Sequence, residues 1–199
     1  MAVVIKSWTK TLSNPYAPEA RGMLSIGSLL LLGAAAGLLH VHLRYPLNIP
    51  GHHGLEWMAL LLFGRLLSDQ RGAATILASG AAASYLLQTP FLSLAHDFKP
   101  ALVFLLTGTG ADIMFPYLRD RLPVILTAGL IGGLVFVCKP AVDYALFILT
   151  DMHVGSFAKH PAFLPFLSHF LFGAVGGVGG GILAQAVRSI GPEQTDHPQ

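Results

Sequence analysis

The stretch GMLSIGSLLLLGAAAGLLHVHL, residues 22–43, contains no Asp, Glu, Lys or Arg. An α-helix needs about 20 predominantly apolar residues to cross the hydrocarbon core of a bilayer, so this stretch predicts a membrane-spanning helix. The rest of the chain has the same character: 53% of its 199 residues are hydrophobic and 11% are charged, whereas soluble domains carry about 25% charged residues. The mean hydropathy is +0.63. The sequence therefore predicts an all-α integral membrane protein.

Further apolar segments follow this stretch, separated by short polar or proline-containing turns. They cover about residues 54–67, 72–88, 100–118, 122–149 and 161–190. With the first segment they predict a bundle of six transmembrane helices over residues 22–190. A polar N-terminal segment, residues 1–21, precedes this membrane domain, and a polar tail, residues 191–199, follows it.

The basic residues are divided unevenly between the two sides of the predicted bundle. Eight lie on the side of the N-terminus and three on the other: Lys6, Lys10, Arg21, Arg65, Arg71, Arg119, Arg121 and Arg188 against Arg44, Lys99 and Lys159. Cytoplasmic loops of membrane proteins carry an excess of Lys and Arg, so both termini are predicted to be cytoplasmic. The basic residues form no patch of the kind that binds nucleic acid.

The histidines are equally one-sided. Eight of the nine fall in the predicted outer loops or the adjoining helix ends: His40, His42, His52, His53, His96, His153, His160 and His169. Histidine in or near a bilayer is costly unless it is paired, hydrated or bound to a ligand. The set therefore predicts a functional outer face, and its densest part is PGHHGLEW, residues 50–57.

Within PGHHGLEW, His52 and Glu56 are four residues apart, so they share one face of a helix that begins near Pro50. They are candidates to contact a polar ligand or, as a histidine–carboxylate pair, to chelate a divalent metal. They could equally pair with each other. His53 and Trp57 have the same spacing.

A second polar group lies in the outer third of the fifth segment. Lys139 and Asp143 are four residues apart, and Tyr144 is beside them. Such a pair either neutralises itself or lines a cavity. Pro140 is the expected position of a bend, because a proline inside a helix frees a backbone carbonyl, here near Cys138 and Lys139. A bent, charged helix predicts a binding pocket that opens outward.

Three further polar residues are candidates. His96 and Asp97, before the fourth segment, either cap that helix or close over a ligand, and His169 is placed to reach the same cavity. Asp112, in the cytoplasmic half of the fourth segment, is predicted to form an internal salt bridge with Arg65 or Arg121, and the alternative is a role in proton transport.

Small residues recur at helical spacing in three segments. They lie at Gly33, Ala34, Ala35, Ala36 and Gly37, at Gly129 and Gly133, and at Gly173, Gly177 and Gly181. Small residues allow close approach of helix backbones in lipid. They predict packing within the bundle or, for residues 33–37, a docking surface for another membrane subunit.

The layout resembles the substrate-binding S components of energy-coupling factor transporters, which are prokaryotic six-helix uptake proteins with both termini inside. The resemblance covers most of the chain and rests on the small-residue stretch 33–37, on residues 46–59 with Phe63-Gly64-Arg65 and Gly72-Ala73-Ala74, and on the glycine-rich stretch 169–181.

This resemblance implies a location in the prokaryotic cytoplasmic membrane, a transmembrane coupling subunit docked on residues 33–37, and a pair of ATPases. By position it implies ligand contacts from His52, His53, Glu56, Trp57, Lys139, Asp143 and His169. Cobalt and nickel members of the family bind metal through an N-terminal Met-His segment, whereas this chain begins Met1-Ala2-Val3. The departure favours an organic ligand over a metal, and no cofactor is predicted.

The sequence thus predicts a substrate-capture subunit for uptake of a small vitamin-like, polar or aromatic molecule. No catalytic or nucleotide motif is present, so an enzyme is not expected. The predicted ligand-binding residues are His52, His53, Glu56, Trp57, His96, Asp97, Lys139, Asp143, Tyr144 and His169. The alternative is a haem- or metal-binding accessory subunit of a respiratory or photosynthetic complex, with haem iron between residues such as His40 and His169. A third hypothesis is a membrane enzyme with a histidine-rich outer site.

Overall fold

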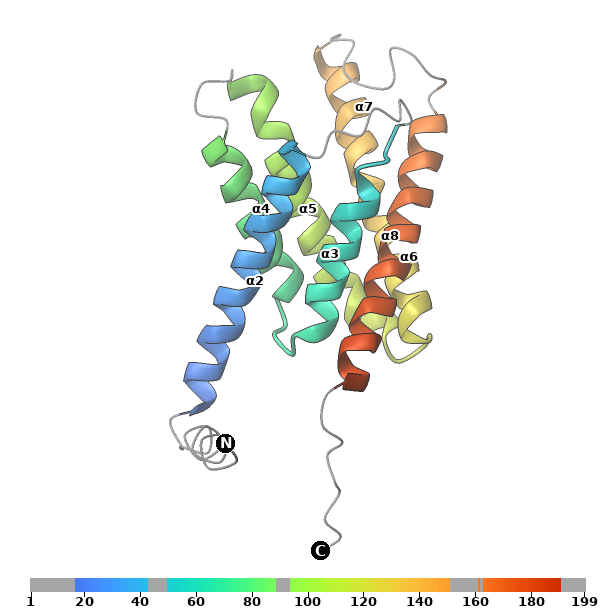
Figure 1. Ribbon diagram of the computed structural model, residues 1–199. Helices are drawn as coiled ribbons and strands as arrows, with labels where there is room; N and C mark the ends of the chain where they lie inside the picture. Colours follow the sequence, from blue (N-terminus) through green and yellow to red (C-terminus); the bar gives the residue numbers. More distant parts are fainter. Residues whose placement is uncertain (1–16, 43–49, 89–93, 151–160, 162, 191–199) are drawn as a thin grey trace, which may run out of the picture.

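The computed structural model describes residues 17–42, 50–88, 94–150, 161 and 163–190, without the side chains of residues 17–24, 94–97, 150 and 190. Throughout these residues the regular secondary structure is α-helix, which confirms the all-α part of the predicted fold class. The helices are α2 (Ala17–His42), α3 (Gly54–Leu67), α4 (Ala73–Gln88), α5 (Leu94–Leu118), α6 (Val124–Phe136), α7 (Cys138–Thr150) and α8 (Phe163–Ile190). Figure 1 shows them arranged along one common direction, with the start of α2 and the end of α8 at the same end of the bundle.

Among the described residues, four helical stretches are long and apolar enough to cross a membrane. They are Ser25–His42, Phe98–Leu118, Val124–Leu149 and Phe163–Ser189. The other two helices are shorter, since α3 has 14 residues and α4 has 16. At about 1.5 Å per residue, α3 is about 21 Å long, less than the thickness of a hydrocarbon core.

The short helix α3 lies at the centre of the bundle, in contact with α2, α4, α5, α6 and α8. Its Met58, Leu61 and Leu62 are essentially inaccessible, and they pack with Leu77 of α4 and Ile131 of α6 in one hydrophobic core. Much of α3 is therefore covered by protein, so its length is set by its neighbours as much as by the thickness of a bilayer.

Glycines bring the helix backbones into direct contact at the main interfaces. A Cβ on Gly33 of α2 would overlap the backbone of Leu77 in α4, and one on Gly80 of α4 would overlap the backbone of Leu30. Between α6 and α8, a Cβ on either Gly132 or Gly173 would overlap the backbone carbonyl of the other. The predicted small-residue interfaces are therefore packing surfaces within the chain.

The stretch predicted to dock a partner is divided by this packing. Gly33, Ala36 and Gly37 are buried, and α4 covers both glycines, whereas Ala34 is half-buried and Ala35 is exposed. Because α4 already occupies the glycine face, that face is not open to another subunit. Docking on α2 stays a prediction, and it rests on Ala34 and Ala35.

The fifth predicted segment is interrupted, as expected, but at a different residue. The break falls at Val137, between α6 and α7, three residues before Pro140. An α-helix bonds each N–H to the carbonyl four residues earlier, so the missing N–H of Pro140 frees the carbonyl of Phe136 rather than one near Cys138 or Lys139. Helical bonding resumes with the N–H of Ala141 on the carbonyl of Val137, 3.2 Å away.

At the end of the bundle where α8 terminates, Asp112 of α5 joins three helices. Its carboxylate lies 2.8 Å from Nε of Arg65 in α3, which confirms Arg65 as its salt-bridge partner. It also accepts hydrogen bonds from the Ala74 N–H at 3.3 Å and from the Thr75 N–H and hydroxyl, both at 2.8 Å. An acceptor at the start of α4 satisfies N–H groups that have no partner within the helix.

Candidate ligand-binding site

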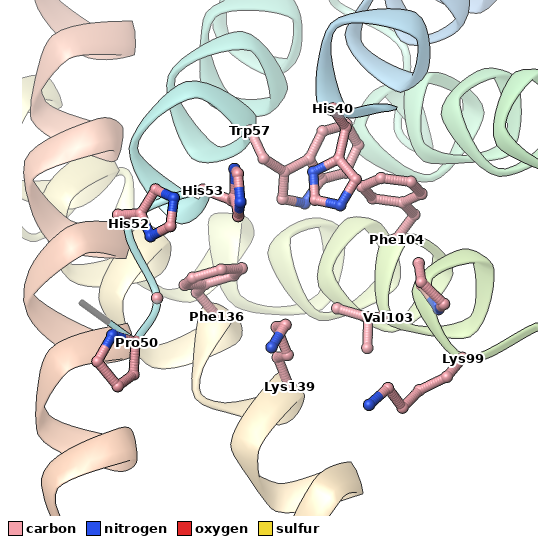
Figure 2. A pocket seen from close by; sticks show the side chains of 12 residues that line it. His40, Pro50, His52, His53, Trp57, Lys99, Val103, Phe104, Phe136 and Lys139 are labelled. Atoms are coloured by element: carbon pink, nitrogen blue, oxygen red, sulfur yellow. The ribbon is translucent and has the colours of Figure 1, made fainter. Parts of the chain in front are cut away.

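A cavity of about 290 Å³ lies towards the opposite end of the bundle, where α2 ends and α3 and α5 begin. Five helices and the segment before α3 contribute to it. Its lining residues are His40, Pro50, Gly51, His52, His53, Trp57, Lys99, Pro100, Val103, Phe104, Phe136 and Lys139. Figure 2 shows the three histidines on one side and the two lysine side chains on the other.

The turn before α3 places two of the histidines. Gly51 has a φ of +86°, a conformation that glycine adopts without steric cost. Its carbonyl accepts the N–H of Gly54 at 2.8 Å, which tightens the chain immediately ahead of the helix. A Cβ on Gly51 would also come within 3.0 Å of His169. Only glycine therefore fits both the backbone and the space at this turn.

The three histidine rings form one cluster. The centroids of His52 and His53 are 3.9 Å apart, and that of His40, from the last turn of α2, is 5.3 Å from His53. The rings of His40 and Phe104 also meet in a T-shaped arrangement, with their centroids 5.2 Å apart. The cluster presents ring nitrogens and ring faces from two segments that are distant in sequence.

An aromatic wall with an internal hydrogen bond supports this cluster. Trp57 is 4% exposed, and the centroid of its ring lies 4.6 Å from that of the Phe104 ring. Its indole N–H donates to the hydroxyl of Thr107 at 3.0 Å, and that hydroxyl donates to the carbonyl of Phe104 at 2.8 Å. Because its N–H is used within the protein, Trp57 offers the cavity an apolar ring surface rather than a donor.

The opposite side of the cavity carries positive charge. Asp143 of α7 has a side chain 3% exposed and binds two lysines: Lys99 of α5 at 2.6 Å and Lys139 at 3.6 Å. Both lysines line the cavity, whereas Asp143 is not among the lining residues. The predicted Lys139–Asp143 pair is therefore present, with a second lysine from another helix added to it.

His169 lies behind the lining residues. It is 1% exposed, and its ring stacks on that of Phe136 with the centroids 5.1 Å apart. Its Nδ1 is 2.6 Å from the carbonyl of Pro165, and a carbonyl only accepts, so Nδ1 carries the proton. His169 thus packs against Phe136 and the turn at Gly51. It was predicted to reach the cavity, but it is not among the residues that line it.

The remaining predicted residues have varied positions. Glu56 is half-buried on α3 but is not among the residues that line the cavity. Tyr144 is 41% exposed, and its ring pairs with Phe166 at 6.4 Å. His96 and Asp97 begin α5, but their side chains lie outside the described residues, as do His153 and His160.

The structure thus brings together His52, His53, Trp57 and Lys139 around the cavity, and Asp143 binds Lys139 without lining the cavity itself. Sequence reasoning did not include His40 among the predicted ligand-binding residues and named it only as a candidate haem ligand, and it missed Lys99. A lone lysine ahead of a proline at an outer helix end could have indicated Lys99. Phe104 and Phe136 carry no such signal, because each lies in an apolar segment.

Within the part of the chain that the structure describes, no three or more His, Cys, Asp and Glu side chains are placed to hold one metal ion. The cavity instead combines aromatic surfaces with histidines and a lysine–aspartate–lysine group, a combination suited to a small organic molecule with a polar end. In comparisons with known proteins, no protein-family model, curated protein or solved structure matches this chain.

Proposed function

We propose that the protein is a substrate-capture subunit of a prokaryotic uptake transporter, similar in role to the S components of energy-coupling factor transporters. It lies in the cytoplasmic membrane as six spans with both termini inside. α6 and α7 together form one span, and α3 and α4 form two short ones. Its cavity faces outward and takes up a small vitamin-like molecule.

The cavity is the observation that supports this proposal. Binding sites for small molecules are mostly apolar, with a few polar groups that fix orientation, and this cavity has aromatic walls with two lysines and three histidines. It lies at the end of the bundle away from Arg65, Arg71, Arg119 and Arg188. The excess of basic residues at that other end favours its cytoplasmic location.

A transporter subunit of this kind needs a source of energy. The chain contains no nucleotide-binding motif. As in the S components that it resembles, a coupling subunit and a pair of ATPases would supply the energy. Ala34 and Ala35, on the side of α2 that the bundle leaves accessible, are the proposed contact with the coupling subunit.

The test is to purify the tagged full-length protein gently from its native membrane. Native mass spectrometry should find a bound small molecule, and protein identification should find a coupling subunit with two ATPases. Replacing the exposed Ala35 with a bulky residue (Ala35→Trp) should release the partners but keep the molecule. The matched control, Ile26→Trp, alters an exposed position on the opposite side of α2, nine residues before Ala35. Purification with neither a bound molecule nor ATPases would contradict the proposal.

A metal- or haem-binding accessory subunit is the second candidate, favoured by the neighbouring rings of His40, His52 and His53. Elemental analysis and a visible spectrum of the same preparation test it. Stoichiometric metal or a haem absorption band would establish it in place of the first proposal.

A further inference from the structure

Resting on the proposed function, we infer that the ligand is a planar monoanion: one or two aromatic rings that carry a single carboxylate. Its carboxylate contacts Lys139, and its rings lie against Trp57, Phe104 and the histidine cluster. The inference follows from charge balance, from the shape of the walls and from the volume of the cavity.

Among the described residues, the charged side chains that line the cavity and the carboxylate that binds them do not balance. Lys99 and Lys139 contribute two positive charges, and Asp143 contributes one negative charge. Counting histidine as neutral, as in the formal charge at pH 7, and leaving out Glu56, which does not line the cavity, one positive charge remains. A charge removed from bulk water is unfavourable unless it is compensated, so a monoanion completes this site, whereas a neutral molecule leaves the excess and a dianion reverses it.

Lys139 is the lysine available to such a ligand. Lys99 is held against Asp143 at 2.6 Å and its side chain is 22% exposed, whereas Lys139 is 3.6 Å from Asp143 and 32% exposed. A carboxylate that enters the cavity can therefore bind Lys139 while Lys99 continues to neutralise Asp143. Lys99 therefore has a structural role, and Lys139 binds the ligand.

The walls favour a flat ligand. Trp57, Phe104 and Phe136 contribute ring surfaces, and the cluster of His40, His52 and His53 faces the lysines across the cavity. Aromatic rings pack best against other rings in offset or edge-to-face arrangements. A cavity of roughly 150 Å³ accepts benzene, so the 290 Å³ present here admits one or two rings with a carboxylate.

Binding of matched probes to the purified full-length protein tests the inference. The probes are 2-naphthoate, its neutral analogue 2-naphthamide, and naphthalene-2,6-dicarboxylate, measured by calorimetry. The monocarboxylate should bind at least about tenfold more tightly than the amide, which is the effect of one charge-assisted hydrogen bond. Equal binding of amide and monocarboxylate, or no binding of any probe, would overturn the inference.

Variants locate the carboxylate. Lys139→Met should abolish the preference for the monocarboxylate over the amide, and Lys139→Arg should retain it. Arg119→Met, which removes a charge from an exposed side chain at the other end of the bundle, should change nothing. An unchanged preference in Lys139→Met would overturn the inference. If Lys139→Met does not fold, Asp143→Asn provides the test: by adding one net positive charge it should shift preference towards the dicarboxylate, and no shift would count against the inference.

The two proposals fail separately. Selective binding of the monocarboxylate without any ATPase partner would contradict the transporter role and leave the ligand class standing. Recovery of the ATPases together with a neutral bound molecule would support the transporter role and contradict the ligand class.

Discussion

Asp112 and Asp143 are nearly buried carboxylates at opposite ends of the bundle, and both hold basic side chains from other helices. Asp112 also accepts three hydrogen bonds at the start of α4, from the Ala74 N–H and from the N–H and hydroxyl of Thr75. Its partner Arg65 additionally lies over the ring of Phe115, 4.1 Å from the centroid, where a guanidinium gains a cation–π interaction. A single carboxylate therefore connects α3, α4 and α5.

Removing that carboxylate should be costly. Asp112→Ala leaves the guanidinium of Arg65 without its partner in a site where the side chain is 8% exposed, so we expect a loss of about 3–5 kcal/mol in stability. The control is Asp120→Ala, which breaks the exposed Arg119–Asp120 pair and should cost about 1 kcal/mol or less. Thermal denaturation in detergent compares the two. Similar melting temperatures for both variants would contradict this role of Asp112.

Individual site residues were predictable where their chemistry is unusual for a membrane segment. Histidine, lysine and aspartate stand out among apolar residues, which is why His52, His53 and Lys139 were found. Phe104 and Phe136 could not be found, because a phenylalanine that faces a cavity and one that faces lipid have equally apolar surroundings. Their role depends on helix pairing, which the order of residues does not reveal.

At the scale of helices, apolar runs and polar turns were enough to place most boundaries. α3 occupies residues 54–67 and α4 begins within one residue of its predicted start. The break in the fifth segment was expected, and its displacement to Val137 follows from counting hydrogen bonds back from Pro140. The pairing of α2 with α4 and of α6 with α8 was not predictable, because small residues occur in several segments and suit any of them.

The contact of α6 with α8 should tolerate no added side chain. Gly132→Ala would place a methyl group against the backbone of Gly173 and force the helices apart, so we expect a clear drop in melting temperature. Gly179→Ala, where nothing lies within 4 Å of the added Cβ, is the matched control on α8 and should be neutral or slightly stabilising, since alanine is the better helix former. Equal effects of the two changes would show that close packing does not govern this interface.

The break between α6 and α7 should depend on Pro140. In Pro140→Ala, a backbone N–H is available for the carbonyl of Phe136, so α6 and α7 should join. Spin labels at the exposed positions Leu126 and Leu149, in a Cys138→Ser background, would then move towards the separation of about 35 Å expected for 23 residues of straight helix. The control Ala145→Ser keeps the proline and should leave the distance unchanged. No lengthening in Pro140→Ala would assign the break to other contacts.

At the scale of the whole molecule, the most extensive contacts join α2 to α4 to α5 on one side and α3 and α6 to α8 on the other. The cavity lies between these two groups. His40, Lys99 and Phe104 come from the first, and Trp57 and Phe136 come from the second. A ligand in the cavity therefore contacts both groups of helices. A shift of one group relative to the other would change the shape of the cavity.

The orientation of the bundle is open to direct measurement. The excess of basic residues on one side predicts both chain ends in the cytoplasm. Single cysteines added after residue 199 or placed at position 2, in the Cys138→Ser background, should react with a membrane-impermeant maleimide only after the cells are opened. A cysteine at Phe98, which is 53% exposed at the start of α5, should react in intact cells. The opposite pattern would invert the orientation and place the cavity inside.

The salt bridge between Lys99 and Asp143 joins residues that leave the ribosome at different times. Lys99 emerges 44 residues before Asp143, so during synthesis its charge has no contact with this partner. Phe136 and Lys139 are also absent until the fifth segment has been made. The cavity is consequently completed only after α7 has been made, although α8 is synthesised later still. A chain interrupted before Lys139 would retain the histidine cluster and Lys99 without the carboxylate of Asp143 that pairs with Lys99.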